Sequence, residues 1–136
     1  MKAITIWQPY AQAIASGLKK YETRSWPTRY RGPIAIHGAL HPMSKDLSAL
    51  AWRHNLSADL PYGAIVAICE VVDCVRITSE LIARQSTTEL EFGDWRVGRY
   101  AWRLKLLKVL DTPVQIRGAQ GLWNISDGTD FCIVSA

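Results

Sequence analysis

The sequence predicts an α+β fold, a small mixed β-barrel with short helices packed at its ends. Three observations indicate it: the predicted strands outnumber the helices, the strands are short, and two helices fall between the early strands. The chain has 136 residues, of which 49% are hydrophobic and 21% are charged. This composition is typical of one folded domain with its own core, so residues 1–136 are expected to form a single domain.

The N-terminal part of the chain predicts two strands around one helix. Residues 3–7 alternate isoleucine with other residue types, which favours a strand. Pro9 fits the first turn of a helix that continues to about Ser16, and Gly17 suits the position just after a helix. Residues 20–25 are expected to follow as a second strand.

A loop, a strand and a helix are predicted next. Residues 26–33 contain two prolines and a glycine, which is typical of a loop. Residues 34–37 form a short apolar strand. Residues 43–54 predict a helix that Ser44 would cap. Its inward stripe would consist of Leu47, Leu50 and Ala51.

Residues 63–73 form the strongest predicted strand. They are rich in β-branched residues and apolar on both faces, so this strand is expected at the centre of the sheet. Glu70 interrupts the apolar run, and burying a carboxylate without a partner is costly. A paired position at the rim of the sheet is therefore expected for Glu70, with a place in a site as the alternative.

The C-terminal half is less regular. Thr78 is expected to cap a short helix that ends near residue 83, and residues 86–97 are polar and stay unassigned. Residues 118–123 predict a tight glycine turn that carries a tryptophan, and residues 131–134 predict a closing strand.

Residues 99–109 predict a long strand, and Pro113 is expected to end this region. One face of the strand would be apolar, and the other would be basic and exposed to water. The apolar face would carry Tyr100, Trp102, Leu104 and Leu106, and the basic face Arg99, Arg103 and Lys105.

Several classes of protein are disfavoured. The longest aliphatic run, residues 64–69, is far too short to cross a bilayer, and the N-terminus lacks the apolar core of a signal peptide, so a cytoplasmic protein is expected. The three cysteines are odd in number and form no C-x-x-C pair, which disfavours a disulfide framework. His37 and His41 do not share a helical face, so neither a metal site nor a cofactor is expected.

The net charge of +4 is unevenly distributed along the chain. Residues 19–31 hold five basic residues and one acid, and residues 96–108 hold five basic residues and no acid. Residues 70–94 reverse the sign, with six acids and two arginines. If the two basic segments meet in space, they form a basic face that suits an anionic partner; the alternative is a mixed solvated surface.

Residues 17–26 concentrate the unusual side chains. In an extended strand over residues 20–25, Lys20, Glu22 and Arg24 share one face, and residues 21, 23 and 25 share the other. A carboxylate between two cations stays ionised and orients them, which suits a polar or anionic ligand. A solvated edge strand, whose charges discourage aggregation, is the alternative.

These residues resemble the ASCH domain of the PUA-like superfamily. The resemblance rests on Ile-Trp-Gln-Pro-Tyr-Ala at residues 6–11 and on Gly-x-Lys-x-x-Glu-x-Arg-x-Trp at residues 17–26. Residues 34–37, 100–104 and 121–123 resemble the family in the same order, so the match covers nearly the whole chain. It implies a PUA-like barrel with a cleft lined by residues 19–24, acting on RNA or modified nucleosides.

One bacterial branch of this family hydrolyses the acetyl amide of N4-acetylcytidine, with the motif lysine, a threonine three residues later and a distant glutamate. Lys19 matches the lysine, but Glu22 stands at the threonine position, as in a longer branch that keeps Glu-Thr-Arg. Thr23 is one residue further and would face the opposite side of the strand. Glu70 is only a candidate for the distant glutamate.

Two main functions follow as hypotheses. The first is a binding module for single-stranded RNA or a modified nucleobase, in which tryptophans stack a base, cations take phosphates, and Glu22 and Gln8 read the base edge. Trp52 and Trp102 are expected in the core. The other candidate ligand residues are Trp7, Arg24, Trp26, His37, Arg103 and Trp123.

The second hypothesis is an amidohydrolase, with Glu22 as general base on water and Lys19 stabilising the oxyanion. Two neighbouring cations would make Glu22 a weak base, which favours binding over catalysis. A domain that only contacts other proteins, with a vestigial cleft, is a third possibility.

Overall fold

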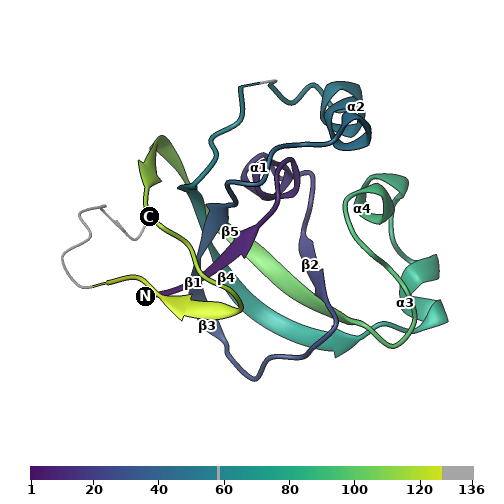
Figure 1. Ribbon diagram of the computed structural model, residues 1–136. Helices are drawn as coiled ribbons and strands as arrows, with labels where there is room; N and C mark the ends of the chain where they lie inside the picture. Colours follow the sequence, from purple (N-terminus) through teal and green to yellow (C-terminus); the bar gives the residue numbers. More distant parts are fainter. Residues whose placement is uncertain (58, 127–136) are drawn as a thin grey trace.

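The computed structural model describes residues 1–57 and 59–126 as a curled six-stranded sheet with four short helices (Figure 1). The strands are β1 (Lys2–Ile6), β2 (Tyr21–Arg24), β3 (Gly32–Gly38), β4 (Ala64–Arg76), β5 (Tyr100–Gln115) and β6 (Leu122–Asn124). The helices are α1 (Tyr10–Ala15), α2 (Lys45–Arg53), α3 (Ser79–Ala83) and α4 (Thr87–Glu91).

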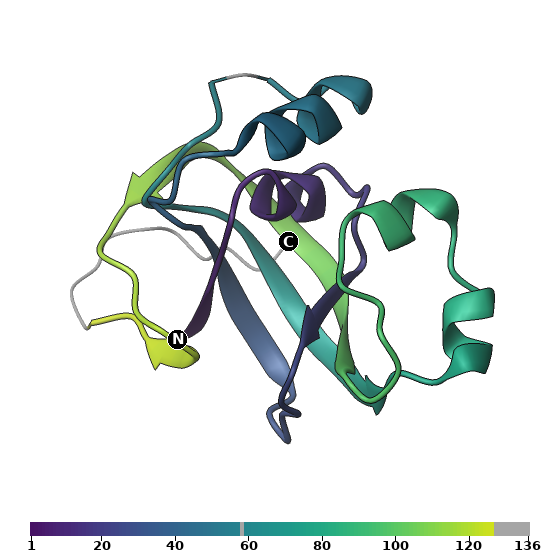
Figure 2. The ribbon, with the colours of Figure 1, turned by 45° about the vertical axis from the view of Figure 1, so that its right-hand side comes forward.

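The strand order in the sheet is β2-β5-β4-β3-β1-β6. β1 and β3 are parallel, and the other neighbouring pairs are antiparallel. β4 and β5 are long and irregularly paired, and the sheet curls so that β2 approaches β1 from the far edge (Figures 1 and 2). The result is the small α+β half-barrel that the sequence predicts.

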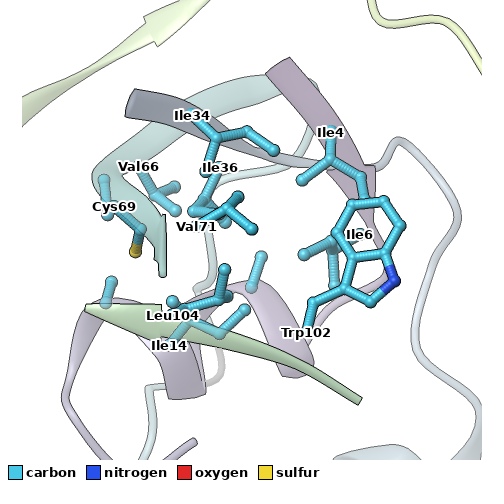
Figure 3. Packing of buried hydrophobic residues seen from close by; sticks show 13 residues of the cluster. Ile4, Ile6, Ile14, Ile34, Ile36, Val66, Cys69, Val71, Trp102 and Leu104 are labelled. Atoms are coloured by element: carbon cyan, nitrogen blue, oxygen red, sulfur yellow. The ribbon is translucent and has the colours of Figure 1, made fainter. Parts of the chain in front are cut away.

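The main core fills the inside of this curl (Figure 3). α1 packs against β3, β4 and β5 and places Ile14 among the strand residues, while Trp102 from β5 is fully buried. The labelled side chains of Figure 3 converge from α1 and four strands. Helix α1 therefore plugs the half-barrel, as expected from its place between two early strands.

The second face of the sheet is also covered near β1, β3 and β4. Ile65 and Ile68 pack there with Ile125 and with parts of the chain around residues 110–123. β4 is consequently buried on both faces over most of its length, which confirms its predicted central position.

Helices α3 and α4 lie beyond β2 and cover the outer side of that edge (Figure 2). Leu81 from α3 and Trp95 pack with Ala101 of β5 and with Tyr21 of β2. Phe92, directly after α4, packs with Ala13 of α1 and Leu50 of α2. This arrangement holds the segment at residues 92–94 beside β2.

The predicted helix ends are confirmed. Gly17 has φ +81°, a conformation that glycine adopts easily, directly after α1. The side chains of Ser44 and Thr78 accept backbone N–H groups at the starts of α2 and α3. Ser86 caps α4 in the same way, inside the segment that sequence patterns leave unassigned.

Two predictions about β5 and α2 are wrong. β5 continues past Pro113 to Gln115, because the pairing with β4 jumps between Val109 and Val114 and the proline lies in the bulge, where no ladder N–H is needed. Trp52 is 80% exposed, on the outer side of α2, and is not part of the core. The predicted strand at residues 131–134 lies outside the described residues.

Across the described residues, no helix combines the length and the apolar character needed to cross a membrane.

Candidate functional site

A cavity of about 310 Å³ opens where the curled sheet brings β2 close to β1. Its walls come from the end of β1, the start of α1, the strand β2 and the loop after α4. The lining residues are Thr5, Ile6, Trp7, Tyr10, Lys19, Glu22, Thr23, Arg24, Phe92, Gly93, Asp94 and Arg99. The charged residues of the Gly-x-Lys-x-x-Glu-x-Arg motif therefore line one cavity.

Glu22 is the centre of an ion-pair network in this wall. Its Oε2 accepts a hydrogen bond from Nε of Arg24 at 2.8 Å, and its Oε1 lies 3.8 Å from Nζ of Lys19. Glu22 is 7% exposed and Lys19 is 3% exposed, so the pair is nearly withdrawn from water. Burial makes each charge dependent on the others, since an unpaired buried ion is costly.

Lys19 is held by several groups besides Glu22. Its ammonium donates to the backbone carbonyl of Phe92 and lies 5.8 Å from the centroid of the Tyr10 ring. Burial lowers the pKa of Lys19, and the carboxylates of Glu22 and Glu89 oppose this shift. Burial and the charge of Glu22 together raise the pKa of the Tyr10 phenol.

Arg24 bridges the gap between the two strands. While Nε binds Glu22, Nη2 donates to the carbonyl of Thr5 at 3.0 Å, near the end of β1. The Arg24 side chain remains 24% exposed, and a guanidinium has five N–H donors, so further donors can face a ligand. Arg24 is therefore both a clasp between β1 and β2 and a cation at the cavity surface.

A second charged group, around Asp94, also lines the cavity. Arg99 Nε lies 3.6 Å from Asp94 Oδ2 and donates to the Asp94 carbonyl, and Arg96 also binds Asp94. The Arg96 guanidinium holds the pKa of Asp94 below its usual range.

The Thr23 hydroxyl accepts the Asp94 N–H at 3.1 Å, so it is directed to this loop. A Cβ on Gly93 would lie 2.9 Å from the Trp95 indole nitrogen, so only glycine permits this close approach.

Trp7 stands at the cavity rim and is 51% exposed. Its ring stacks on that of His41, with 4.0 Å between the centroids and 20° between the planes. His41 belongs to the loop between β3 and α2. An exposed, stacked aromatic pair thus borders the charged cavity.

Gln8 follows Trp7 in sequence and has a different role. It is fully buried, its Oε1 accepts the Gln12 N–H at 2.9 Å, and its Nε2 donates to the Pro61 carbonyl at 2.9 Å. The amide therefore holds the start of α1 and the chain before β4 in place, and it does not line the cavity.

The remaining predicted ligand residues lie elsewhere. His37 is buried on the far side of β1, with Nδ1 3.1 Å from Thr5 Oγ1 and Nε2 2.7 Å from the Ile116 carbonyl. Trp123 donates to the same Thr5 hydroxyl and packs edge-on against His37. Trp26 packs at the edge of the main core, perpendicular to Trp102.

The two basic segments meet, because β2 pairs with β5 and Tyr21 lies opposite Arg103. Arg103 donates to the Tyr21 hydroxyl at 3.1 Å on the outer surface. β4 brings two acids to the same surface, Asp73 opposite Arg103 and Glu70 opposite Lys105. The outer face therefore has mixed charge, and Glu70 lies on it, away from the cavity lining.

Sequence reasoning did not propose as ligand residues three cavity residues, Tyr10, Asp94 and Arg99, or His41, which stacks on Trp7. Tyr10 has the pattern of an ordinary helix residue, and His41 that of a loop residue. Asp94 and Arg99 lie in or beside the segment left unassigned. For the segment of Asp94, the sequence offers one indication: Gly93 stands between an aromatic residue and an acid, which is typical of a close backbone approach.

Comparison with known proteins gives a consistent result. The sequence matches the ASCH domain family over residues 4–110. The human protein "Activating signal cointegrator 1" is 28% identical over 81 residues, which are 53% of this chain and only 14% of the human protein.

In structure, the chain is similar to the ASCH protein of Zymomonas mobilis, with a TM-score of 0.59 at 15% identity, covering 93% of this chain and 87% of that one. A crystal structure of a point mutant of the same bacterial protein gives a TM-score of 0.58 at 16% identity, covering 93% and 90%. At this identity the likeness concerns the fold. The family match spans most of the sequence, so the chain belongs to the ASCH domain family, whose PUA-like fold is associated with RNA binding.

Proposed function

We propose that the cavity between β1 and β2 binds a nucleobase of single-stranded RNA or a modified nucleoside. The observation that supports this most directly is the Glu22 carboxylate, fixed between Lys19 and Arg24 in a cavity with aromatic residues at its rim. A volume of about 310 Å³ is at the small end of ligand pockets, which suits one nucleoside.

The polar groups suit a base edge and a phosphate. A carboxylate has about four lone-pair sites, so Glu22 can accept from an exocyclic amine while it keeps its contact with Arg24. Arg24 and Arg99 supply partly exposed cations at the cavity, with side chains 24% and 23% exposed. A guanidinium there can bind a phosphate with two parallel hydrogen bonds.

Arg24→Gln tests this proposal. Its affinity for a fluorescein-labelled single-stranded RNA, measured by anisotropy, should fall about tenfold, as expected when a hydrogen bond to a charged group is lost. Arg31→Gln is the matched control, because Arg31 is exposed, pairs with Asp73 and lies outside the cavity lining. An equal loss in both variants would mean that only net charge matters, and no RNA binding by the wild type would reject the proposal.

A second candidate, hydrolysis of a nucleoside amide, is favoured by one observation: Lys19 is buried with a lowered pKa beside a carboxylate. Such groups are common in active sites. Glu22 would take a proton from water as the water adds to the acetyl carbonyl of N4-acetylcytidine, and Lys19 would stabilise the oxyanion. The C–N bond would then break, Glu22 would return the proton to N4, and cytidine and acetate would be released. Thr23 is directed to the Asp94 backbone, which argues against a threonine nucleophile.

Mass spectrometry of cytidine release from N4-acetylcytidine separates the two candidates. If the site only binds, the wild type gives no release above a protein-free control. Release that disappears in Lys19→Met and persists in Arg31→Gln would instead establish the hydrolase. Release that both variants retain would point to a contaminating enzyme.

A further inference from the structure

Trp7 is exposed, whereas the residues before and after it in the sequence are buried. Ile6 and Gln8 on either side of it are buried, so the backbone of Trp7 is anchored while its indole remains in water. Trp95 and Trp102 are both almost completely buried. A half-exposed tryptophan on a fixed backbone leaves apolar area that a partner can cover.

The parallel pairing of β1 with β3 builds the stack with His41. Ile6 pairs with Gly38, and the Ala39 N–H donates to the Ile6 carbonyl at 2.9 Å. The loop that carries His41 is thereby tied to the end of β1. α1 and α2, which follow these two strands, lie side by side in both views (Figures 1 and 2). The indole is consequently oriented by a ring on a separate loop.

We propose that Trp7, oriented by His41, stacks the nucleotide next to the one in the cavity, so that the ligand is a strand of RNA and not a free nucleoside. This inference rests on the proposed function of the cavity. Trp7 belongs to both features, since it lines the cavity and also stacks on His41 outside it. One strand can therefore place one base in the cavity and its neighbour against the indole.

The charges support a strand as the occupant. A link between two nucleotides carries a phosphate, and the cavity offers three cations, Lys19, Arg24 and Arg99, against two acids, Glu22 and Asp94. Base stacking on an aromatic side chain tolerates any sequence, because each base has a π-face. Stacking on the Trp7 indole would thus add affinity for RNA strands without selecting the neighbouring base.

The test compares a strand with a single nucleotide. Randomised RNA trinucleotides and a mixture of the four nucleoside 5′-monophosphates compete with a labelled single-stranded RNA for the full chain. In wild type the trinucleotides should compete better, and Trp7→Ala should reduce this preference about tenfold, the typical effect of one lost stacked base. Trp52→Ala is the control, because Trp52 is 80% exposed on α2 and does not line the cavity.

His41 is tested as a positioning residue. His41→Ala should lower the trinucleotide preference. His41→Phe should keep the preference of the wild type, because a phenyl ring can stack on the indole. If Trp7→Ala kept the preference for trinucleotides as fully as Trp52→Ala, the proposed stacking on Trp7 would be rejected. The cavity proposal would still stand in that case if Arg24→Gln weakened the binding of both competitors, so the two proposals fail separately.

Discussion

The polar network on the cavity side of β1 and the network on its other side both contact Thr5, through different atoms. The Thr5 carbonyl accepts from Arg24, which belongs to the charged group in the cavity wall. The Thr5 hydroxyl contacts His37 and Trp123, and Trp123 packs against the cluster of Ile65, Ile68 and Ile125 on the other face of the sheet.

The two networks differ in how completely they are satisfied. His37 uses both ring nitrogens inside the protein, and Trp123 uses its indole N–H. Such a closed network stabilises one arrangement and leaves nothing for a ligand. In the cavity wall, Arg24 and Glu22 keep further donor and acceptor capacity beside an open volume. Spare bonding capacity beside a cavity is what distinguishes the candidate site from structural polar groups.

The largest effect is expected from Glu22→Gln. This change leaves the buried Lys19 ammonium without its counter-charge and should lower the free energy of unfolding by about 3 kcal/mol, the typical cost of breaking a buried ion pair. Urea unfolding measures it. In the Lys19→Met background the same substitution should cost much less, because no buried cation remains. An equal cost in both backgrounds would contradict the proposed dependence of Lys19 on Glu22.

His37→Phe tests the other network. It leaves the Ile116 carbonyl and the Thr5 hydroxyl without their partner and should cost about 2 kcal/mol in the free energy of unfolding. RNA affinity, measured at a temperature where the variant is folded, should not change. A specific loss of RNA affinity would show that His37 contributes to binding after all and would remove the contrast between the two sides of β1.

The lowered pKa of Lys19 should contribute to the pH dependence of the free energy of unfolding. Because its pKa is lowered on folding, the unfolded chain binds a proton that the folded protein does not, at pH values between the folded pKa and the ordinary lysine value. In that range, which lies below the ordinary lysine value, the wild type should gain stability relative to Lys19→Met as pH rises, by at most about 1.4 kcal/mol per pH unit for one proton.

Unfolding curves of both proteins at several alkaline pH values give the comparison. The raised pKa values of Tyr10 and of Cys69, the latter about 12, act in the opposite direction, but they are present in both proteins and largely cancel. A difference that falls with rising pH would contradict the lowered pKa of Lys19.

The sequence predicts the fold and the centre of the cavity because both depend on local patterns. Strand alternation, the apolar run at residues 63–73 and the caps Ser44 and Thr78 are read from neighbouring residues, and the structure confirms them. Spacing along the strand predicts Lys20, Glu22 and Arg24 on one face, but Lys20 does not line the cavity. Lys19, which the family motif indicates, takes its place beside Glu22.

What sequence patterns do not predict depends on contacts between distant segments. Asp94 reaches the cavity because the loop after α4 lies beside β2, and His41 reaches Trp7 because β3 pairs with β1. Gln8 resembles a ligand residue in sequence, yet its amide is used by Gln12 and by Pro61, which is 53 residues away. Whether a polar group is spare or satisfied is decided by such partners.

Trp52→Ala should have the smallest effect and separates the two kinds of exposed tryptophan. Residue type and the helical pattern favour a core position for Trp52, but Leu50 and Ala51 supply the buried stripe of α2 and the indole is 80% exposed. Removing it should change the free energy of unfolding by no more than about 0.5 kcal/mol, as for other surface substitutions. Urea unfolding and RNA competition on the same sample measure both properties. A loss of RNA affinity that matches Trp7→Ala would move the binding surface from the cavity rim to the outer side of α2, since both tryptophans are exposed and only Trp7 lines the cavity.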